Sequence, residues 1–310
     1  MIHPVPSGTR DVLPDEMREL HAITATMRDV FEQAGYGEIH TPALEFESVL
    51  RRGDPEAARP AYRFFDEDGR VLVLRSDMTI PIARVVATRY AGAEPPLRFS
   101  YFAHAYRAVR AQRGEAREQL QVGIELVGSP GAAGSAEALT VLCRALDATG
   151  LVDYRVGVGD AGLYSSLLTE LRVPMGAHRK LLHELTSRDF VGLRQEIEAL
   201  HLPAEHADLL VRVPQTRGGA EVLEHAAGLK ELDGLLPEDV RSRVIYDLGL
   251  ARDLGYYTGA IFEVYDAALG VPIGGGGRYD DLLGRFGRPL PAVGWALDLD
   301  RVHGAVVGER

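Results

Sequence analysis

The chain has 310 residues, 46% of them hydrophobic, which is enough to bury one large core or a core plus a smaller module. Its 34 Lys and Arg residues against 45 Asp and Glu residues give a net charge of −11, which disfavours broad attraction to nucleic acid, although a local basic loop could still bind phosphates. The sequence has no apolar run of about 18 residues and no signal-peptide pattern at its start, so a soluble, cytoplasmic protein is expected.

The cysteine and histidine content argues against disulfide and metal sites. Cys143 is the only cysteine, so no intramolecular disulfide can form, and we expect it to be a small buried hydrophobe. The ten histidines are scattered, and the closest pairs, His178/His183 and His201/His206, are five residues apart. Five residues are roughly 140° of rotation on a helix, so neither pair shares a face as metal ligands must. No metal site and no cofactor are predicted.

The first part of the chain predicts one helix and two short strands. Apolar residues over 17–31 recur at three- and four-residue spacing, and Asp15 and Glu16 favour the N-terminus of this helix. Residues 38–46 then indicate a short strand that leads toward another at 71–74.

Two alternating segments follow and predict an antiparallel pair of strands. Residues 97–107 and 118–126 change faces with the period of a strand, and a polar, arginine-bearing loop joins them. On 118–126 one face is wholly apolar, and the other carries Gln119, Gln121, Gly123 and Glu125. A helix is expected next, over 135–149.

From about residue 162 the pattern becomes helical, with apolar residues at helical spacing between prolines. Strand patterns return at 244–248, 257–265 and 291–299. We therefore expect an α+β fold in which residues 1–161 and 236–310 build one antiparallel sheet flanked by helices, interrupted by a helical insertion at 162–235.

The most informative candidate site is the strand at 121–125. Gln121 and Glu125 lie four residues apart, so an amide and a carboxylate project side by side, which suits an ammonium or imidazole ligand. Gly123 between them is expected to leave open space above the sheet for a small molecule. Arg107 ends the neighbouring strand on the same face as Tyr101 and is expected to point into the groove of the sheet. An ordinary solvent-facing polar strand is the alternative.

The connecting loop carries Arg110, Arg113 and Arg117, whose guanidinium groups present the planar donors that suit phosphates and carboxylates. A solvated loop with Glu115 and Glu118 as partners is the alternative.

Two other segments give weaker signals. Arg252 precedes Tyr256 and Tyr257, and alternation in a regular strand predicts that at most one of these tyrosines lines a pocket directly. Residues 273–280 (IGGGGRYD) predict a tight four-glycine turn without a ligand, with close backbone approach to a ligand as the alternative, because they match neither a P-loop nor a dinucleotide fingerprint.

Six segments, taken in order, resemble the signature regions of class II aminoacyl-tRNA synthetases, and more narrowly the histidine-specific branch. They are 6–11 (PSGTRD), 74–84 (LRSDMTIPIAR), Arg107, 121–128 (QVGIELVG), 252–259 (RDLGYYTG), and 276–280 with 292–301. The resemblance covers nearly the whole chain and implies the antiparallel sheet flanked by helices that is typical of that class.

The resemblance implies a histidine pocket. Its residues would be Asp77, Thr79, Arg107, Gln121, Glu125, Arg252, Tyr256 and Tyr257. Acidic and amide oxygens would accept hydrogen bonds from the ammonium and imidazole groups, and an arginine would pair with the carboxylate. Possible anion-binding residues, for ATP or phosphoribosyl pyrophosphate, are Arg110, Arg113, Arg117 and Arg301.

Departures from the synthetase pattern indicate a paralogue that has lost amino-acid activation. Val109 stands where the resemblance expects the glutamate that reads adenine, and Gly255 stands where it expects an aspartate. The sequence also ends nine residues after Arg301, where a synthetase would continue into an anticodon-binding domain.

These departures favour the regulatory subunits of ATP phosphoribosyltransferase, which resemble histidyl-tRNA synthetases but are not enzymes. Such a subunit would be required by a short catalytic subunit and would carry feedback inhibition by histidine in the first step of histidine biosynthesis. The implied partners are that catalytic subunit in a hetero-oligomer, a second copy of this chain, and histidine as effector; neither tRNA nor a membrane is expected. The alternatives are a histidyl-tRNA synthetase core, a free-standing histidine-activating enzyme, or a scaffold that does not bind histidine.

Overall fold

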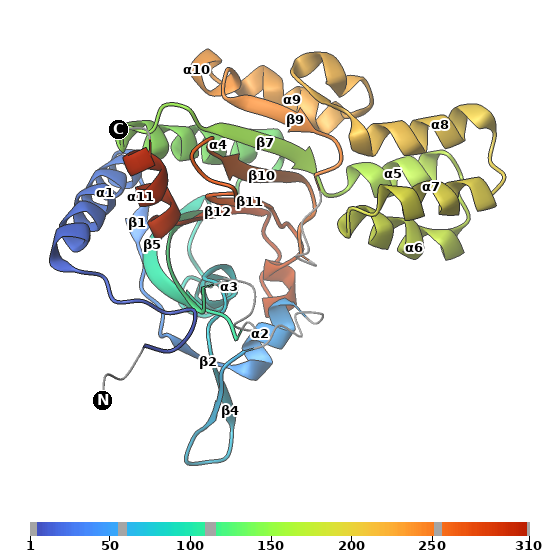
Figure 1. The fold of residues 1–310 in the computed structure, drawn as a ribbon. Helices are drawn as coiled ribbons and strands as arrows, with labels where there is room; N and C mark the ends of the chain where they lie inside the picture. The colour runs from blue at the N-terminus through green and yellow to red at the C-terminus, as the bar shows by residue number, and fades with distance from the viewer. Residues whose placement is uncertain (1–4, 55–60, 109–115, 251–255, 309–310) are drawn as a thin grey trace.

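A computed structural model of the chain describes residues 5–54, 61–108, 116–250 and 256–308 (Figure 1). Within these ranges the main feature is a nine-stranded sheet of order β1-β5-β6-β12-β11-β10-β7-β9-β8. In that order the strands are Gly37–Glu38, Leu97–Tyr106, Glu118–Val127, Ala292–Asp298, Gly274–Arg278, Ala260–Tyr265, Arg155–Asp160, Val244–Asp247 and Arg217–Gly218. Neighbours pair antiparallel except in β1–β5 and β7–β9. The predicted α+β class and the pairing of 97–107 with 118–126 are confirmed.

Helices cover one face of this sheet. α4 (Gly131–Ala148) and α11 (Leu299–Gly308) pack against the central strands β6 and β12, and α1 (Pro14–Gln33) packs against both of these helices (Figure 1). α1 buries Leu20, Ile23, Met27 and Phe31, all within the stripe that helical spacing predicts. The helices expected over 17–31 and 135–149 are therefore confirmed, and the main core lies between them and the sheet.

A second sheet in the described part of the chain has three strands in the order β2-β4-β3, and β2 and β4 project away from the main sheet (Figure 1). The strands are Leu44–Phe46, Val71–Leu74 and Arg63–Phe65, and α2 (Glu47–Gly53) and α3 (Thr79–Thr88) lie nearby. The prediction of one strand over 38–46 is wrong, because β1 and β2 belong to different sheets. Pro42 lies between them and has no backbone N–H to continue a ladder.

Residues 162–235 contain most of the remaining helices (Figure 1). They are α5 (Leu163–Glu170), α6 (Met175–Thr186), α7 (Phe190–Ala199), α8 (Ala204–Arg212), η2 (Val213–Gln215), η3 (Ala220–His225) and α9 (Ala227–Leu235). α10 (Glu238–Arg241) and η4 (Leu283–Phe286) follow. α9 packs on α4, and its buried leucines join the main core, so the division into domains stays a prediction. Over the described ranges, no helix combines the length and the apolar character needed to cross a membrane.

The four glycines at 274–277 form most of β11, inside the sheet, so the predicted tight turn is wrong. Their small size serves packing. A Cβ on Gly276 would lie 2.6 Å from the Cβ of Trp295, and one on Gly277 would lie 2.9 Å from the ring of Tyr257. Only glycine lets those two aromatic side chains lie directly on the strand.

Candidate functional site

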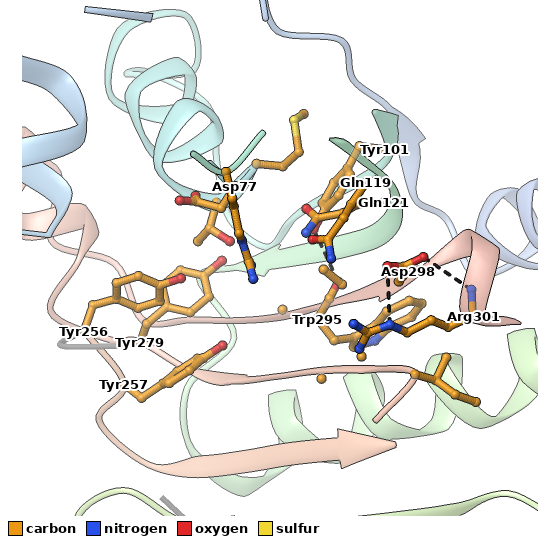
Figure 2. Close-up of a pocket in the computed structure, with 18 residues that line it drawn as sticks. Asp77, Tyr101, Gln119, Gln121, Tyr256, Tyr257, Tyr279, Trp295, Asp298 and Arg301 are labelled. Carbon is orange, nitrogen blue, oxygen red and sulfur yellow. Dashed lines mark hydrogen bonds and ion pairs between the residues drawn. The ribbon is translucent and has the colours of Figure 1, made fainter. Parts of the chain in front are cut away.

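A cavity of about 150 Å³ lies on the sheet face opposite the main core (Figure 2). Strand alternation places it there, because Val122, Ile124 and Leu126 of β6 are fully buried in the main core while Gln121 and Glu125 point the other way. Strands β5, β6, β11 and β12, the start of α3 and the segment before β10 all contribute lining residues.

Glu125 lies at the base of this site and is 1% exposed. Its Oε1 accepts a hydrogen bond of 2.7 Å from the Thr79 hydroxyl, and its Oε2 accepts one from the Tyr279 hydroxyl. Burial raises the pKa of Glu125 to about 8, although the two hydroxyl donors lower it, and the nearby charge of Asp77 raises it further. Burial therefore favours the protonated acid more than it would for an exposed glutamate.

Glycine in the neighbouring strand makes room for this carboxyl. Gly294 is the cross-strand partner of Glu125, and a Cβ there would lie 1.8 Å from Glu125 Oε2 and 2.5 Å from the carbonyl oxygen of Ile124. Thr79 and Tyr279 line the cavity, whereas Glu125 is not among the lining residues. Glu125 is connected to the cavity by its hydrogen bonds to the hydroxyl groups of these two residues.

Asp77 and Thr79 are positioned by the first turn of α3, and both line the cavity. Asp77 Oδ1 accepts a hydrogen bond of 3.0 Å from the backbone N–H of Ile80, and the Ser76 hydroxyl donates to Asp77 Oδ2 over 3.2 Å. These contacts hold the carboxylate at the helix N-terminus, where negative charge is favoured.

Gln121 carries a buried polar atom without a hydrogen-bond partner among the described residues. Its side chain lines the cavity and is 8% exposed, and the atom is its amide oxygen, Oε1. Buried acceptors are normally paired, because leaving one unpaired costs about 1–3 kcal/mol. The amide oxygen is therefore available to a donor that enters the cavity.

Tyr256 and Tyr257 both line the cavity, so the prediction that at most one of them does so is wrong. β10 begins only at Ala260, so the alternation of a regular strand does not apply to them. Their ring centroids lie 5.1 Å apart, and the ring of Tyr279 lies 5.8 Å from that of Tyr256 (Figure 2). Arg252 lies outside the described residues, as does Gly255.

The open space expected above Gly123 is absent. A Cβ there would lie 2.5 Å from the Tyr101 hydroxyl oxygen and 2.2 Å from the carbonyl oxygen of Trp295. Tyr101 is the cross-strand neighbour of Gly123, and its side chain covers the glycine and forms part of the cavity wall.

The predicted arginines are placed differently from one another. Arg107 and Arg301 line the cavity; Arg301 donates from Nη1 to the carbonyl oxygen of Pro272 over 2.6 Å. Arg117 is not among the lining residues, and its backbone N–H donates to the carbonyl oxygen of Gly8 over 2.7 Å. Arg110, Arg113 and Val109 lie outside the described residues.

Several lining residues were not predicted from the sequence. They are Tyr101, Gln119, Tyr279, Trp295 and Asp298. Gln119 shares the polar face of its strand with Gln121, a signal that was available, whereas only the sheet register brings Asp298 beside Gln121. Burial raises the pKa of Asp298, and the charge of Arg301 opposes that rise.

Comparison with known proteins gives a consistent set of relatives. The family model described as "Histidyl-tRNA synthetase" matches residues 8–302. The ATP phosphoribosyltransferase regulatory subunit of Symbiobacterium thermophilum is 39% identical over 315 residues, which cover 96% of this chain and 78% of that protein. The subunit of the same name from Moorella thermoacetica is 38% identical over 313 residues, covering 96% of this chain and 80% of that protein.

Among solved structures, one described as an ATP phosphoribosyltransferase regulatory subunit/histidyl-tRNA synthetase from Bacillus halodurans aligns with a TM-score of 0.92. It is 32% identical, and the alignment covers 99% of this chain and 84% of that one. The similarity in sequence and the similarity in fold therefore point to the same group of proteins.

Proposed function

This chain belongs to the histidyl-tRNA synthetase family, in the group of ATP phosphoribosyltransferase regulatory subunits, and from this premise we propose that it is required for the activity of a catalytic ATP phosphoribosyltransferase subunit and carries feedback inhibition by histidine. The same similarities confirm the class II synthetase-like fold expected from the sequence motifs. The proposed role needs no chemistry from this chain, only selective binding and a response in the assembly.

The unpartnered amide oxygen of Gln121 is the observation that carries the histidine-binding part of the proposal. Histidine offers an ammonium group, a carboxylate and imidazole N–H donors. We assign the ammonium group to Asp77 and Gln121, and the carboxylate to Arg107, since each provides the complementary charge or acceptor at the cavity wall.

The imidazole is assigned to the tyrosine end of the cavity. Tyr256 and Tyr257 would contact its ring, and Thr79 and Tyr279 would connect it to the buried carboxyl of Glu125. The sequence pattern assigns Arg252 to the same pocket. A polar cavity of about 150 Å³ lined by aromatic rings suits one small amino acid.

Inhibition requires that histidine binds one state of the assembly better than another. A coupling free energy of about 1–3 kcal/mol between the histidine site and the catalytic partner is sufficient for a useful response. The proposed assembly contains the catalytic subunit and a second copy of this chain.

Calorimetric titration of the purified full-length chain with histidine tests the binding step. We expect heat of binding for the wild type and a loss of affinity of about tenfold or more in Glu125→Ala, which removes the acceptor for two lining hydroxyl groups. Glu125→Gln keeps the volume and supplies a second test if the alanine variant does not fold. Glu118→Ala, on the same strand but outside this cavity, is the control and should bind like the wild type.

Transferase assays with the catalytic subunit test the regulatory step. Activity should appear only in the mixture, and histidine should inhibit the wild-type mixture but not the Glu125→Ala mixture. Absence of histidine binding would refute the binding step. Histidine-dependent pyrophosphate exchange by this chain alone would instead identify a histidine-activating enzyme.

A further inference from the structure

The two ends of the cavity carry different chemistry. Figure 2 shows Tyr256, Tyr257 and Tyr279 at one end and Asp298 with Arg301 at the other. Asp77 provides a carboxylate toward the tyrosine end (Figure 2), so acidic groups stand at both ends of one small cavity. At the end opposite Tyr256 and Tyr257, the local charge depends on both Asp298 and Arg301.

Asp298 is held in a fixed position there. It is the last residue of β12, beside Gln121, and it directly precedes α11. Its Oδ1 accepts hydrogen bonds from the backbone N–H groups of Asp300 and Arg301 over 3.1 and 3.3 Å, as a helix-capping side chain does. Its side chain is 13% exposed. The carboxylate thus occupies the N-terminus of α11.

Arg301 is turned toward groups of the protein itself. Its Nε lies 3.5 Å from Asp298 Oδ2, and its Nη1 donates to the carbonyl oxygen of Pro272 over 2.6 Å. A helix N-terminus and a guanidinium group are the two features at this end that attract anions. The one carboxylate of Asp298 caps the first and pairs with the second.

We propose that Asp298 sets the charge selectivity of the cavity: by occupying the N-terminus of α11 and pairing with Arg301, it excludes phosphate-bearing ligands such as nucleoside triphosphates. An incoming phosphate would meet the carboxylate a few ångströms away. A zwitterionic amino acid bound toward the tyrosine end avoids that repulsion, and this part of the inference rests on the proposed function. The cavity therefore discriminates between histidine and a nucleoside triphosphate by charge as well as by size.

Asp298→Asn tests the proposal directly, because asparagine keeps the helix-capping oxygen and removes the charge. The probes are inorganic pyrophosphate and ATP, each titrated calorimetrically against the full chain without histidine. We expect both to bind on the order of tenfold tighter to the variant, since one like charge at short range and intermediate dielectric contributes about that factor. Unchanged anion affinity would overturn the proposal.

Two further variants locate the effect. Asp300→Asn changes the net charge equally but removes a carboxylate that pairs with Arg10 outside this cavity, so its gain in anion affinity should be clearly smaller. Adding Arg301→Gln to Asp298→Asn should abolish the gain, because the released guanidinium would be the anion receptor. An equal gain in Asp300→Asn, or a gain that survives Arg301→Gln, would refute the assignment.

Histidine titrations of the same proteins separate this inference from the proposed function. If pyrophosphate affinity rises in Asp298→Asn while the wild type binds no histidine, charge selectivity stands and histidine binding fails. If the wild type binds histidine but Asp298→Asn does not change anion affinity, histidine binding stands and the proposed charge selectivity fails.

Discussion

The two faces of strand β6 are nearly equally buried and chemically opposite. Ile124, with Val122 and Leu126, is fully enclosed in the main core under the helices, while Gln121 and Glu125 on the other face are 8% and 1% exposed. Burial of apolar area stabilises a fold by about 25 cal/mol per Å², whereas burial of polar groups costs free energy unless each group is paired. The apolar face of β6 therefore stabilises the fold, whereas burial of the polar face costs part of that stability.

A smaller apolar cluster helps to support the polar face. Phe99, Tyr101 and Ala103 of β5 pack with Met78 and Ile82 around the start of α3. Met78 and Tyr101 of this cluster also line the cavity, so part of the cavity wall is fixed by apolar packing. The contrast between the two faces can be measured in three ways.

The largest expected effect is on the helix-covered face. Ile124→Ala should lower the free energy of unfolding by about 2–5 kcal/mol, because it removes fully buried methyl groups and leaves a space that the core fills only in part. Urea unfolding measures this loss. Ile245→Ala is the matched control; Ile245 is 40% exposed on β9, so its loss should be clearly smaller. Equal losses would contradict the division of roles between the faces.

The sequence predicts the helix-covered face well, because its information is local. Alternation at 118–126 and helical spacing at 17–31 each depend on neighbours within a few residues. The same local pattern identifies Gln121 and Glu125 as a polar pair. The hydroxyl groups that pair with Glu125, those of Thr79 and Tyr279, come from distant segments.

The errors in prediction arise where long-range register decides the outcome. The glycines at 274–277 look like a turn until Trp295 and Tyr257 are seen to fill the space beside them. The space above Gly123 looks open until Tyr101 is placed across from it. Asp298 was not singled out as a site residue, although it lies in a segment that resembles a synthetase signature region, and pairing of β12 with β6 brings it beside Gln121.

The second prediction concerns the buried acid on the polar face. The pKa of Glu125 rises from an ordinary 4.5 to about 8 in the folded chain, so between these values the folded state binds more protons than the unfolded state. The free energy of unfolding contributed by this proton is fully present below pH 4.5, the unfolded-state pKa. It is lost as the pH rises through about 8, the folded-state pKa. The loss amounts to about 1.4 kcal/mol for each pH unit in the interval.

Glu125→Gln removes this titration without changing the volume. Urea unfolding of both proteins from about pH 5 to about pH 8 should show the wild type losing stability relative to the variant as the pH rises. Parallel curves of unfolding free energy against pH would mean that the Glu125 carboxyl is ionised throughout the interval. Burial on the polar face would then not favour its protonated form.

The smallest expected effect is a gain in stability. Gln121→Leu replaces a buried amide whose Oε1 has no partner among the described residues with an apolar side chain of similar size. The free energy of unfolding should rise by about 1 kcal/mol, because an unpaired acceptor no longer has to be buried, while histidine affinity should fall. Gln119→Leu is the control: Gln119 lines the same cavity but is less buried, so its effect on stability should be smaller. A destabilised Gln121→Leu would show that the amide supports the fold, and stability and binding would then no longer be divided between the two faces of β6.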